Sequence, residues 1–196
     1  VLFAAARVLR GTALVRGAAR LRGRAGLAAR MLLASAPMPV SSGARAPPHD
    51  DRSAPSFALL EGCVMRGLFG HVHAATRRAL RASGYVEAAA PGQRCCGALH
   101  AHAGDAAGAR ALARANVDAF DRSGARWIAV NSAGCGAALR EYPRWLKGVP
   151  GLEQRTQRLA ARVRDVSELL AAPPRPVRGR LRGRAGYDAS CHLLHG

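Results

Sequence analysis

Five cysteines are the residues of this sequence with the most distinctive chemistry: Cys63, Cys95, Cys96, Cys135 and Cys191. An odd number that includes one vicinal pair is a poor disulfide framework, because neighbouring cysteines bridge only through a strained ring. Clustered thiols in a reducing compartment more often serve metal or redox chemistry. Thiolates are soft ligands that favour iron–sulfur clusters, zinc or cuprous ions. The cysteines therefore predict a cytosolic protein that binds metal through sulfur.

The elements that would position these cysteines alternate between strands and helices. Short apolar runs predict strands, and apolar residues at helical spacing predict helices. Strict alternation of the two indicates an α/β fold with a mostly parallel sheet and flanking helices. The expected strands are 57–60, 85–89, 127–130 and 185–188, and the expected helices are 68–82, 105–122, 137–146 and 152–171.

The expected strands would bring the cysteines to one edge of the sheet. Each cysteine or cysteine pair follows a strand, and the loops at the carboxyl ends of parallel strands share an edge where ligands bind. A single cysteine is more often an ordinary buried residue than a ligand. Five at strand ends favour one common site, and neighbouring glycines would let the backbone approach a bulky ligand: Gly62, Gly97, Gly134 and Gly136.

The order and spacing of these motifs resemble a known family. Cys63 is followed, after 31 residues, by Cys95-Cys96-Gly97, and then by Ser132-Ala-Gly-Cys135. This pattern resembles the cysteine-rich CCG domain shared by the heterodisulfide reductase B subunit, lactate-utilisation iron–sulfur proteins and the glycolate oxidase iron–sulfur subunit. The segments around the cysteines, from Glu61-Gly-Cys-Val-Met-Arg to Tyr187-Asp-Ala-Ser-Cys-His, are most similar to the glycolate oxidase (glycolate dehydrogenase) subunit over about residues 57–196.

The resemblance implies an electron-transfer subunit of a glycolate (2-hydroxy acid) oxidase or dehydrogenase, with no catalytic residues of its own. Electrons would pass from FAD-containing glycolate oxidase subunits, through iron–sulfur clusters of the 4Fe–4S type, to an acceptor. The expected location is the cytoplasm or the periphery of the inner membrane. The residues that the resemblance implies as cluster ligands are Cys63, Cys95, Cys96 and Cys135, with Cys191 beginning a second site.

The sequence departs from the family pattern in two respects. Ser132 stands where the family has the first cysteine of a Cys-x-x-Cys motif. Four thiolates suffice for a cubane-type cluster but not for a non-cubane cluster that needs five. The ferredoxin-like domain of the family is also missing, so we expect a fragment with four segments. These are an Arg-rich helical segment (1–33), a Pro/Ser-rich linker (34–56), a first cysteine-rich domain (57–186) and the start of a second (187–196).

Two other classes of protein compete with this interpretation. A zinc module would use the same four thiolates tetrahedrally. A nucleic-acid-binding protein would use the formal charge of +18, which comes almost wholly from arginine. Against the second, no aromatic stacking platform accompanies the arginines, and specific nucleic-acid binding is not expected. No apolar run reaches the ~20 residues needed to span a bilayer.

A few other residues suggest roles near the cysteines. His100, His102 and His192 lie beside cysteines and could serve as ligands, although hydrogen bonding is the more common role there. Cys95 with His100 could form a nucleophile and base, with Asp105 as the orienting acid, but a helix N-cap is the simpler role for Asp105. Trp127 is expected to pack in the core. Three further residues are expected to be solvated or to face a partner subunit: Arg140, Tyr142 and Arg144.

Overall fold

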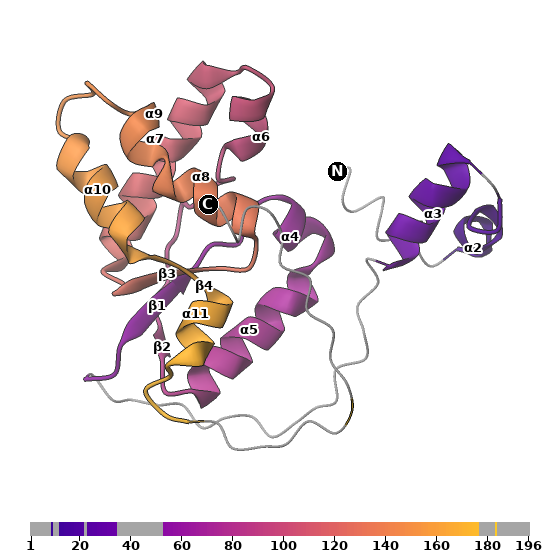
Figure 1. Ribbon diagram of the computed structural model, residues 1–196, viewed down its shortest axis with the longest axis horizontal. Helices are drawn as coiled ribbons and strands as arrows, with labels where there is room; N and C mark the ends of the chain where they lie inside the picture. The colour runs from indigo at the N-terminus through magenta and orange to yellow at the C-terminus, as the bar shows by residue number, and fades with distance from the viewer. Residues whose placement is uncertain (1–8, 10–11, 22, 35–52, 177–182, 184–196) are drawn as a thin grey trace.

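The computed structural model describes residues 9, 12–21, 23–34, 53–176 and 183. Its centre is a four-stranded sheet in the order β2-β1-β3-β4, with every neighbouring pair parallel. Helices flank the sheet, so the α/β fold predicted from the sequence is confirmed (Figure 1). The strands are β1 (Ser56–Leu59), β2 (Val86–Glu87), β3 (Trp127–Val130) and β4 (Val163–Asp165).

Apart from Ser56, the two central strands β1 and β3 consist of apolar residues, because both of their faces are covered. Ala58 of β1 pairs with Ile128 of β3, and both side chains belong to the larger core. Their neighbours Phe57 and Ala129 point to the opposite face and belong to the smaller core. This alternation follows from the two-residue period of a strand, and a parallel sheet buried on both faces has the continuous apolar runs seen here.

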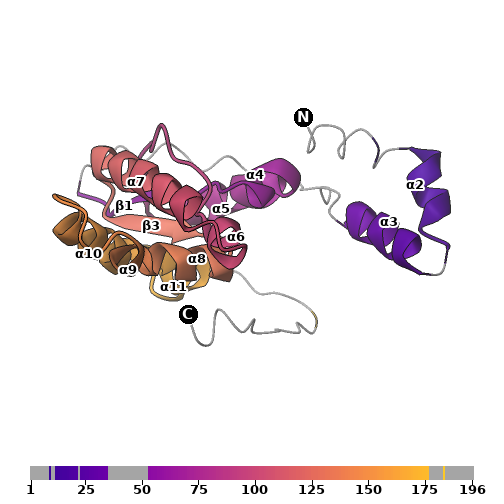
Figure 2. The same ribbon diagram turned by 90° about the horizontal axis from the view of Figure 1, so that it is seen from above.

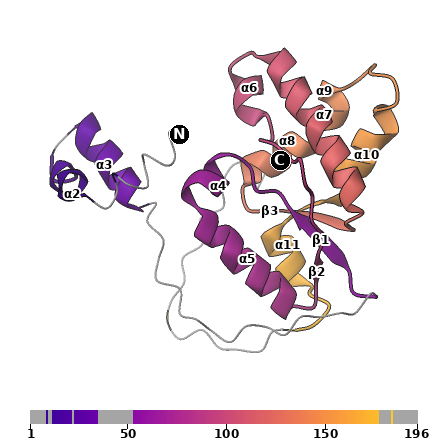
Figure 3. The same cartoon turned by 180° about the vertical axis from the view of Figure 1, so that it is seen from behind.

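Helices α7 and α10 lie on one side of the sheet, and helices α5 and α11 lie on the other (Figures 1 and 3). In Figure 2, which is seen from above, strands β1 and β3 are visible between α7 and α10. The bounds are α4 (Val64–Leu68), α5 (Gly70–Ala82), α6 (Ala98–His102), α7 (Ala106–Ser123), α8 (Ala133–Arg140), α9 (Tyr142–Trp145), α10 (Glu153–Arg162) and α11 (Val166–Ala171).

Helix α7 agrees closely with the sequence prediction. Asp105 caps its N-terminus, with Oδ1 accepting a hydrogen bond of 2.8 Å from the Gly108 amide. Gly124 ends the helix in the left-handed region, at φ 61°. The predicted N-cap at Asp105 is therefore confirmed, and both caps satisfy backbone groups that a helix end would otherwise leave unpaired.

The predicted helix 152–171 is wrong, because a strand interrupts it. β4 separates α10 from α11 and pairs with β3 through Val163, whose side chain is fully buried. Asp165 then starts α11 with a capping box: its side chain accepts from Ser167 N, and Glu168 accepts from Asp165 N. Two of the three residues of β4 are charged, so this edge strand has no apolar run that would predict it from the sequence. The predicted strand 185–188 lies outside the described residues.

Two further helices lie in the Arg-rich segment. They are α2 (Ala13–Ala18), which Thr12 caps, and α3 (Arg24–Ala34), and they contact each other. No helix within the described part of the chain is long and apolar enough to cross a membrane. The four-segment division of the chain stays a prediction.

We expect Ile128→Ala to lower the free energy of unfolding by about 2–5 kcal/mol, because it opens a cavity at a fully buried position of the central strand β3. Leu99→Ala serves as the matched control: Leu99 is 62% exposed, so its change should stay within about 0.5 kcal/mol. Urea unfolding measures both. Equal losses in the two variants would contradict the core described above.

Candidate metal centre

Three loops at the carboxyl ends of the strands carry the cysteines toward one another. Cys63 follows β1 and is the N-cap of α4, and Cys135 lies in the first turn of α8, after β3. The vicinal cysteines follow β2 and precede α6. The Sγ atoms of Cys63 and Cys95 are 3.3 Å apart, and those of Cys96 and Cys135 are also 3.3 Å apart. The structure thus brings four of the five predicted site residues together, while Cys191 lies outside the described residues.

The two thiol pairs differ in their access to solvent. Cys63 and Cys95 are partly buried and line a surface pocket of about 440 Å³, to which Arg66 and Gln93 also contribute. Cys96 is only 3% exposed, and it packs in the larger core with Cys135 against it. One pair therefore faces outward into a cavity, and the other closes the inner side of the site.

The two thiols of the inner pair have pKa values that are shifted in opposite directions. A hydrogen bond from the Cys96 thiol lowers the pKa of Cys135 to about 6, although burial opposes this, and a second hydrogen bond from Ser132 lowers the pKa further. The same contact with Cys135 raises the pKa of Cys96, and burial raises it more. A thiolate at Cys135 is the form that acts as a ligand or nucleophile at neutral pH.

Cys63 of the outer pair holds its proton more strongly than an exposed thiol. Burial raises the pKa of Cys63, as does the contact with Cys95. In the opposite direction, a backbone hydrogen bond at Val64 favours the Cys63 thiolate, as one at Ala98 does for Cys96. Amide groups at the starts of two helices thus point at sulfur, which is how proteins commonly stabilise thiolates that bind a cationic centre.

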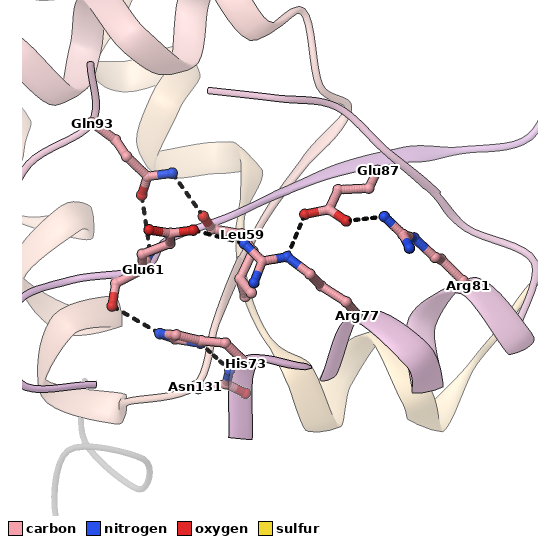
Figure 4. A network of polar contacts seen from close by, with 8 residues as sticks. All are labelled: Leu59, Glu61, His73, Arg77, Arg81, Glu87, Gln93 and Asn131. Atoms are coloured by element: carbon pink, nitrogen blue, oxygen red, sulfur yellow. Dashed lines mark hydrogen bonds and ion pairs between the residues drawn. The ribbon is translucent and has the colours of Figure 1, made fainter. Parts of the chain in front are cut away.

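Gln93 ties the loop of the vicinal cysteines to the Cys63 loop. Its Oε1 accepts a hydrogen bond of 2.9 Å from the Glu61 amide, and its Nε2 donates to the Leu59 carbonyl at 3.0 Å (Figure 4). The Leu59 carbonyl and the Glu61 amide both lie at the carboxyl end of β1, so the Gln93 side chain hydrogen-bonds to this backbone just beyond the sheet. It fixes Cys95 opposite Cys63.

His73 ties the Cys63 loop to the Cys135 loop. Its Nε2 lies 2.8 Å from the Glu61 carbonyl, and its Nδ1 lies 3.0 Å from Nδ2 of Asn131 (Figure 4). Thr76 donates to Oδ1 of Asn131, which orients the amide so that its Nδ2 donates to His73. In this arrangement Nδ1 of His73 accepts from Asn131, and Nε2 donates to the Glu61 carbonyl. His73 is only 3% exposed, so these hydrogen bonds connect the two loops within the buried part of the protein.

Arg77 adds an ionic brace on the outer side of the same loops. It contacts the Glu61 carboxylate at 2.8 Å and the Glu87 carboxylate at 2.6 Å, and Arg81 also contacts Glu87 at 2.6 Å (Figure 4). Helix α5 is thereby linked both to β2 and to the turn before Cys63. Because these groups are partly exposed, each pair contributes only about 1 kcal/mol or less.

A buried polar pair holds the backbone of the vicinal cysteines. Asn116 of α7 accepts a hydrogen bond of 2.7 Å from the Arg94 amide and donates one of 3.0 Å to the Cys95 carbonyl. It also donates to the Tyr142 hydroxyl, which in turn donates to the Cys96 carbonyl, both at 2.9 Å. Asn116 and Tyr142 are fully buried, so the prediction that Tyr142 is solvated or faces a partner is wrong.

Sequence analysis missed this pair, although one signal was present. Asn116 lies between Ala113 and Val117 on the buried stripe of α7, where a polar residue needs a partner. Tyr142 gave no such signal, because Glu141 and Arg144 beside it are polar. Arg144 is indeed exposed and pairs with Glu141.

Gly97 is required after the vicinal pair. Its φ is 87°, in the left-handed region that side chains rarely adopt. A Cβ on Gly97 would also lie 3.2 Å from the Trp145 ring and 3.3 Å from the Ala109 carbonyl. The glycine therefore lets the turn that carries Cys96 pack directly onto α7 and α9.

The proposed nucleophile and base do not meet. His100 Nδ1 bonds to the Asp105 carboxylate at 2.8 Å, and the sulfur neighbour of Cys95 is Cys63. The Cys95–His100 alternative is thus not supported by the geometry.

Trp127 is only partly buried, and the guanidinium of Arg164 lies 4.6 Å from its ring centroid.

The donor set is made of thiols. The four thiols form two contacting pairs beside an open pocket. Within the residues that the structure describes, no group of three or more His, Cys, Asp or Glu side chains is arranged to hold a single metal ion. Thiolates are the ligands of iron–sulfur clusters, which distribute them over several iron atoms, so the residue types present fit such a group.

Residues 57–140 match the family of cysteine-rich domains called CCG. This match, together with four cysteines on three strand-end loops of a parallel sheet, confirms the resemblance to cysteine-rich domains that the sequence indicated. No solved structure matches the chain significantly.

Within this class the chain is similar to iron–sulfur subunits. It is 34% identical to the probable glycolate oxidase iron-sulfur subunit of Bacillus subtilis (strain 168) over 113 residues, which is 58% of this chain and 26% of that protein. It is 31% identical to the glycolate oxidase iron-sulfur subunit of Escherichia coli (strain K12) over 142 residues, 70% of this chain and 35% of the relative.

A second group of relatives is named differently. The chain is 30% identical to lactate utilization protein A of Geobacillus thermodenitrificans (strain NG80-2) over 138 residues, 69% of this chain and 57% of that protein. The chain therefore spans less than two thirds of the length of each of these three relatives.

We expect mild oxidation of the metal-free chain by oxidised glutathione to form the disulfides Cys63–Cys95 and Cys96–Cys135. In each, a thiolate attacks the glutathione disulfide and the second thiol displaces glutathione, so two electrons leave the protein. The sulfurs in each pair are already 3.3 Å apart. Peptide mapping by mass spectrometry without reduction identifies the bridges. A dominant Cys95–Cys96 bridge, or bridges mainly to Cys191, would contradict the arrangement.

Proposed function

We propose that this chain is part of the iron–sulfur subunit of a hydroxy-acid oxidase and carries electrons through a cluster held by Cys63, Cys95, Cys96 and Cys135. The observation that carries the proposal is the convergence of these four thiols, in two contacting pairs, from three separate loops. When bound, a 4Fe–4S cluster would accept and release single electrons, which none of the side chains here does reversibly.

The residues of this chain supply the environment of the centre. Cys135 provides a thiolate at neutral pH, and the Ser132 hydroxyl donates a hydrogen bond to it. Amides at the starts of α4 and α6 donate to Cys63 and Cys96. Hydrogen bonds to sulfur and partial exclusion of water are the means by which a protein sets the potential of a cluster.

The partners follow from the relatives. The curated relatives are named as subunits of glycolate oxidase or as a lactate utilization protein, and both names point to 2-hydroxy acids. We propose that a FAD-containing subunit oxidises the hydroxy acid and delivers electrons one at a time to this chain, which passes them to an acceptor. Cys191 would begin a second cluster site of the same kind. A cytoplasmic location, at the periphery of the inner membrane, fits this assembly.

Anaerobic reconstitution with iron and sulfide tests the proposal. We expect broad visible absorbance and about four irons per chain, as four thiolates hold one cubane cluster. Cys96→Ser should abolish most of this absorbance, because it removes the buried ligand of the inner pair. Cys191→Ser is the matched control, since it also removes one thiol and should leave the first cluster in place.

Metal analysis of the same samples gives the opposing results. A colourless protein with one tightly bound zinc ion would contradict the cluster and would indicate a structural zinc site. Protein that binds neither metal would exclude both, and equal iron loss in Cys96→Ser and Cys191→Ser would show that the four thiols do not form one site.

A further inference from the structure

We propose that Asn116 and Tyr142 are positioning residues that hold the vicinal cysteines so that their two sulfurs point toward different partners. The inference rests on the proposed cluster and adds two residues, neither of which can itself bind iron here. The juxtaposition that carries it is three hydrogen bonds between this buried pair and the backbone of three consecutive residues, Arg94, Cys95 and Cys96, with a fourth that joins Asn116 to Tyr142.

The vicinal pair poses a geometric problem. Cys95 contacts Cys63 of the β1 loop, whereas Cys96 contacts Cys135 of the β3 loop. The directions of two adjacent side chains depend on the backbone angles of both residues, so this arrangement requires that the backbone be held. A loop that follows the two-residue strand β2 has no sheet pairing of its own to hold those angles.

Asn116 and Tyr142 supply what the sheet does not. The Asn116 amide uses its oxygen for Arg94 N and its two N–H groups for Cys95 O and the Tyr142 hydroxyl. Tyr142 then donates its only proton to Cys96 O. Every polar atom of the pair is thus used, and both residues are 0% exposed.

The choice of residues fits this task better than a general role in packing. An apolar residue at position 116 would remove the hydrogen-bond partner of the Arg94 amide and of the Cys95 carbonyl, both at part-buried contacts. Burial also raises the pKa of Tyr142, so its hydroxyl remains a proton donor throughout the physiological range. Positioning groups behind metal ligands typically change metal affinity about 10–100-fold when they are removed.

Tyr142→Phe tests the inference, and Tyr85→Phe is its matched control. Tyr85 is also buried, at 4% exposed, and its hydroxyl donates to a backbone carbonyl, that of Leu169, at 3.0 Å. It belongs to the smaller core on the other face of the sheet, away from the cysteines. Each variant loses one buried hydroxyl, so a purely structural effect would be the same in both.

The first measurement is the rate at which a ferrous chelator strips iron from the reconstituted full chain. Tyr142→Phe should release iron about tenfold faster than wild type, with an altered visible circular dichroism of the cluster. Tyr85→Phe should match wild type in both. Asn116→Ala should release iron at least as fast as Tyr142→Phe. If Asn116→Ala does not fold, the result for Tyr142→Phe alone decides the test.

The second measurement needs no cluster. In metal-free protein oxidised with glutathione disulfide, Tyr142→Phe should replace part of the Cys63–Cys95 and Cys96–Cys135 bridges with other pairings, whereas Tyr85→Phe should not. Equal iron release and equal bridge patterns in the two variants would overturn the positioning role and leave the proposed cluster standing. A wild-type chain that takes up no iron would overturn the cluster, and the bridge pattern alone would then decide whether the pair positions the cysteines.

Discussion

The structure at the cysteine edge depends on holding four thiols within contact distance. Ionised sulfurs repel one another, and buried ones lose their hydration, so the chain alone has no tendency to gather them. Here the opposing forces come from outside the thiols. Gln93 and His73 connect the three loops to one another through backbone groups, and Asn116 with Tyr142 fixes the vicinal pair. Each net contribution is about 0.5–1.5 kcal/mol, which is small against the cost of a misplaced thiolate but acts on every loop.

These braces differ in how firmly they can hold. The ionic contacts of Arg77 lie at a partly exposed surface and weaken with salt. The amide of Asn116 is fully enclosed, so breaking its bonds leaves polar groups unpaired away from water. The enclosed residues Asn116 and Tyr142 hold one cysteine of each thiol pair, through the carbonyls of Cys95 and Cys96. A centre assembled at this edge would therefore be held most firmly at the vicinal cysteines, and it would be open to the pocket beside Cys63 and Cys95.

The fold and the meeting of the cysteines could be predicted because both follow from local patterns. Apolar runs at 57–60 and 127–130 mark buried strands, and parallel strands bring their carboxyl-end loops to one edge. Tertiary partners leave no such trace. β4 was hidden because Arg164 and Asp165 are polar, and only its pairing with β3 makes it a strand. Tyr142 looked solvated beside Glu141 and Arg144, since its burial depends on α7, some twenty-five residues earlier in the chain.

Ser132 bears on the kind of centre this edge can hold. It occupies the position of the missing cysteine, yet its hydroxyl already donates a hydrogen bond to the Cys135 sulfur. A hydroxyl that donates to a thiolate withdraws charge from it, whereas a fifth thiolate at the same place would add charge and repel it. A serine at this position therefore stabilises the neighbouring thiolate in place of adding a fifth one. This is consistent with the proposal of a centre built on four thiolates.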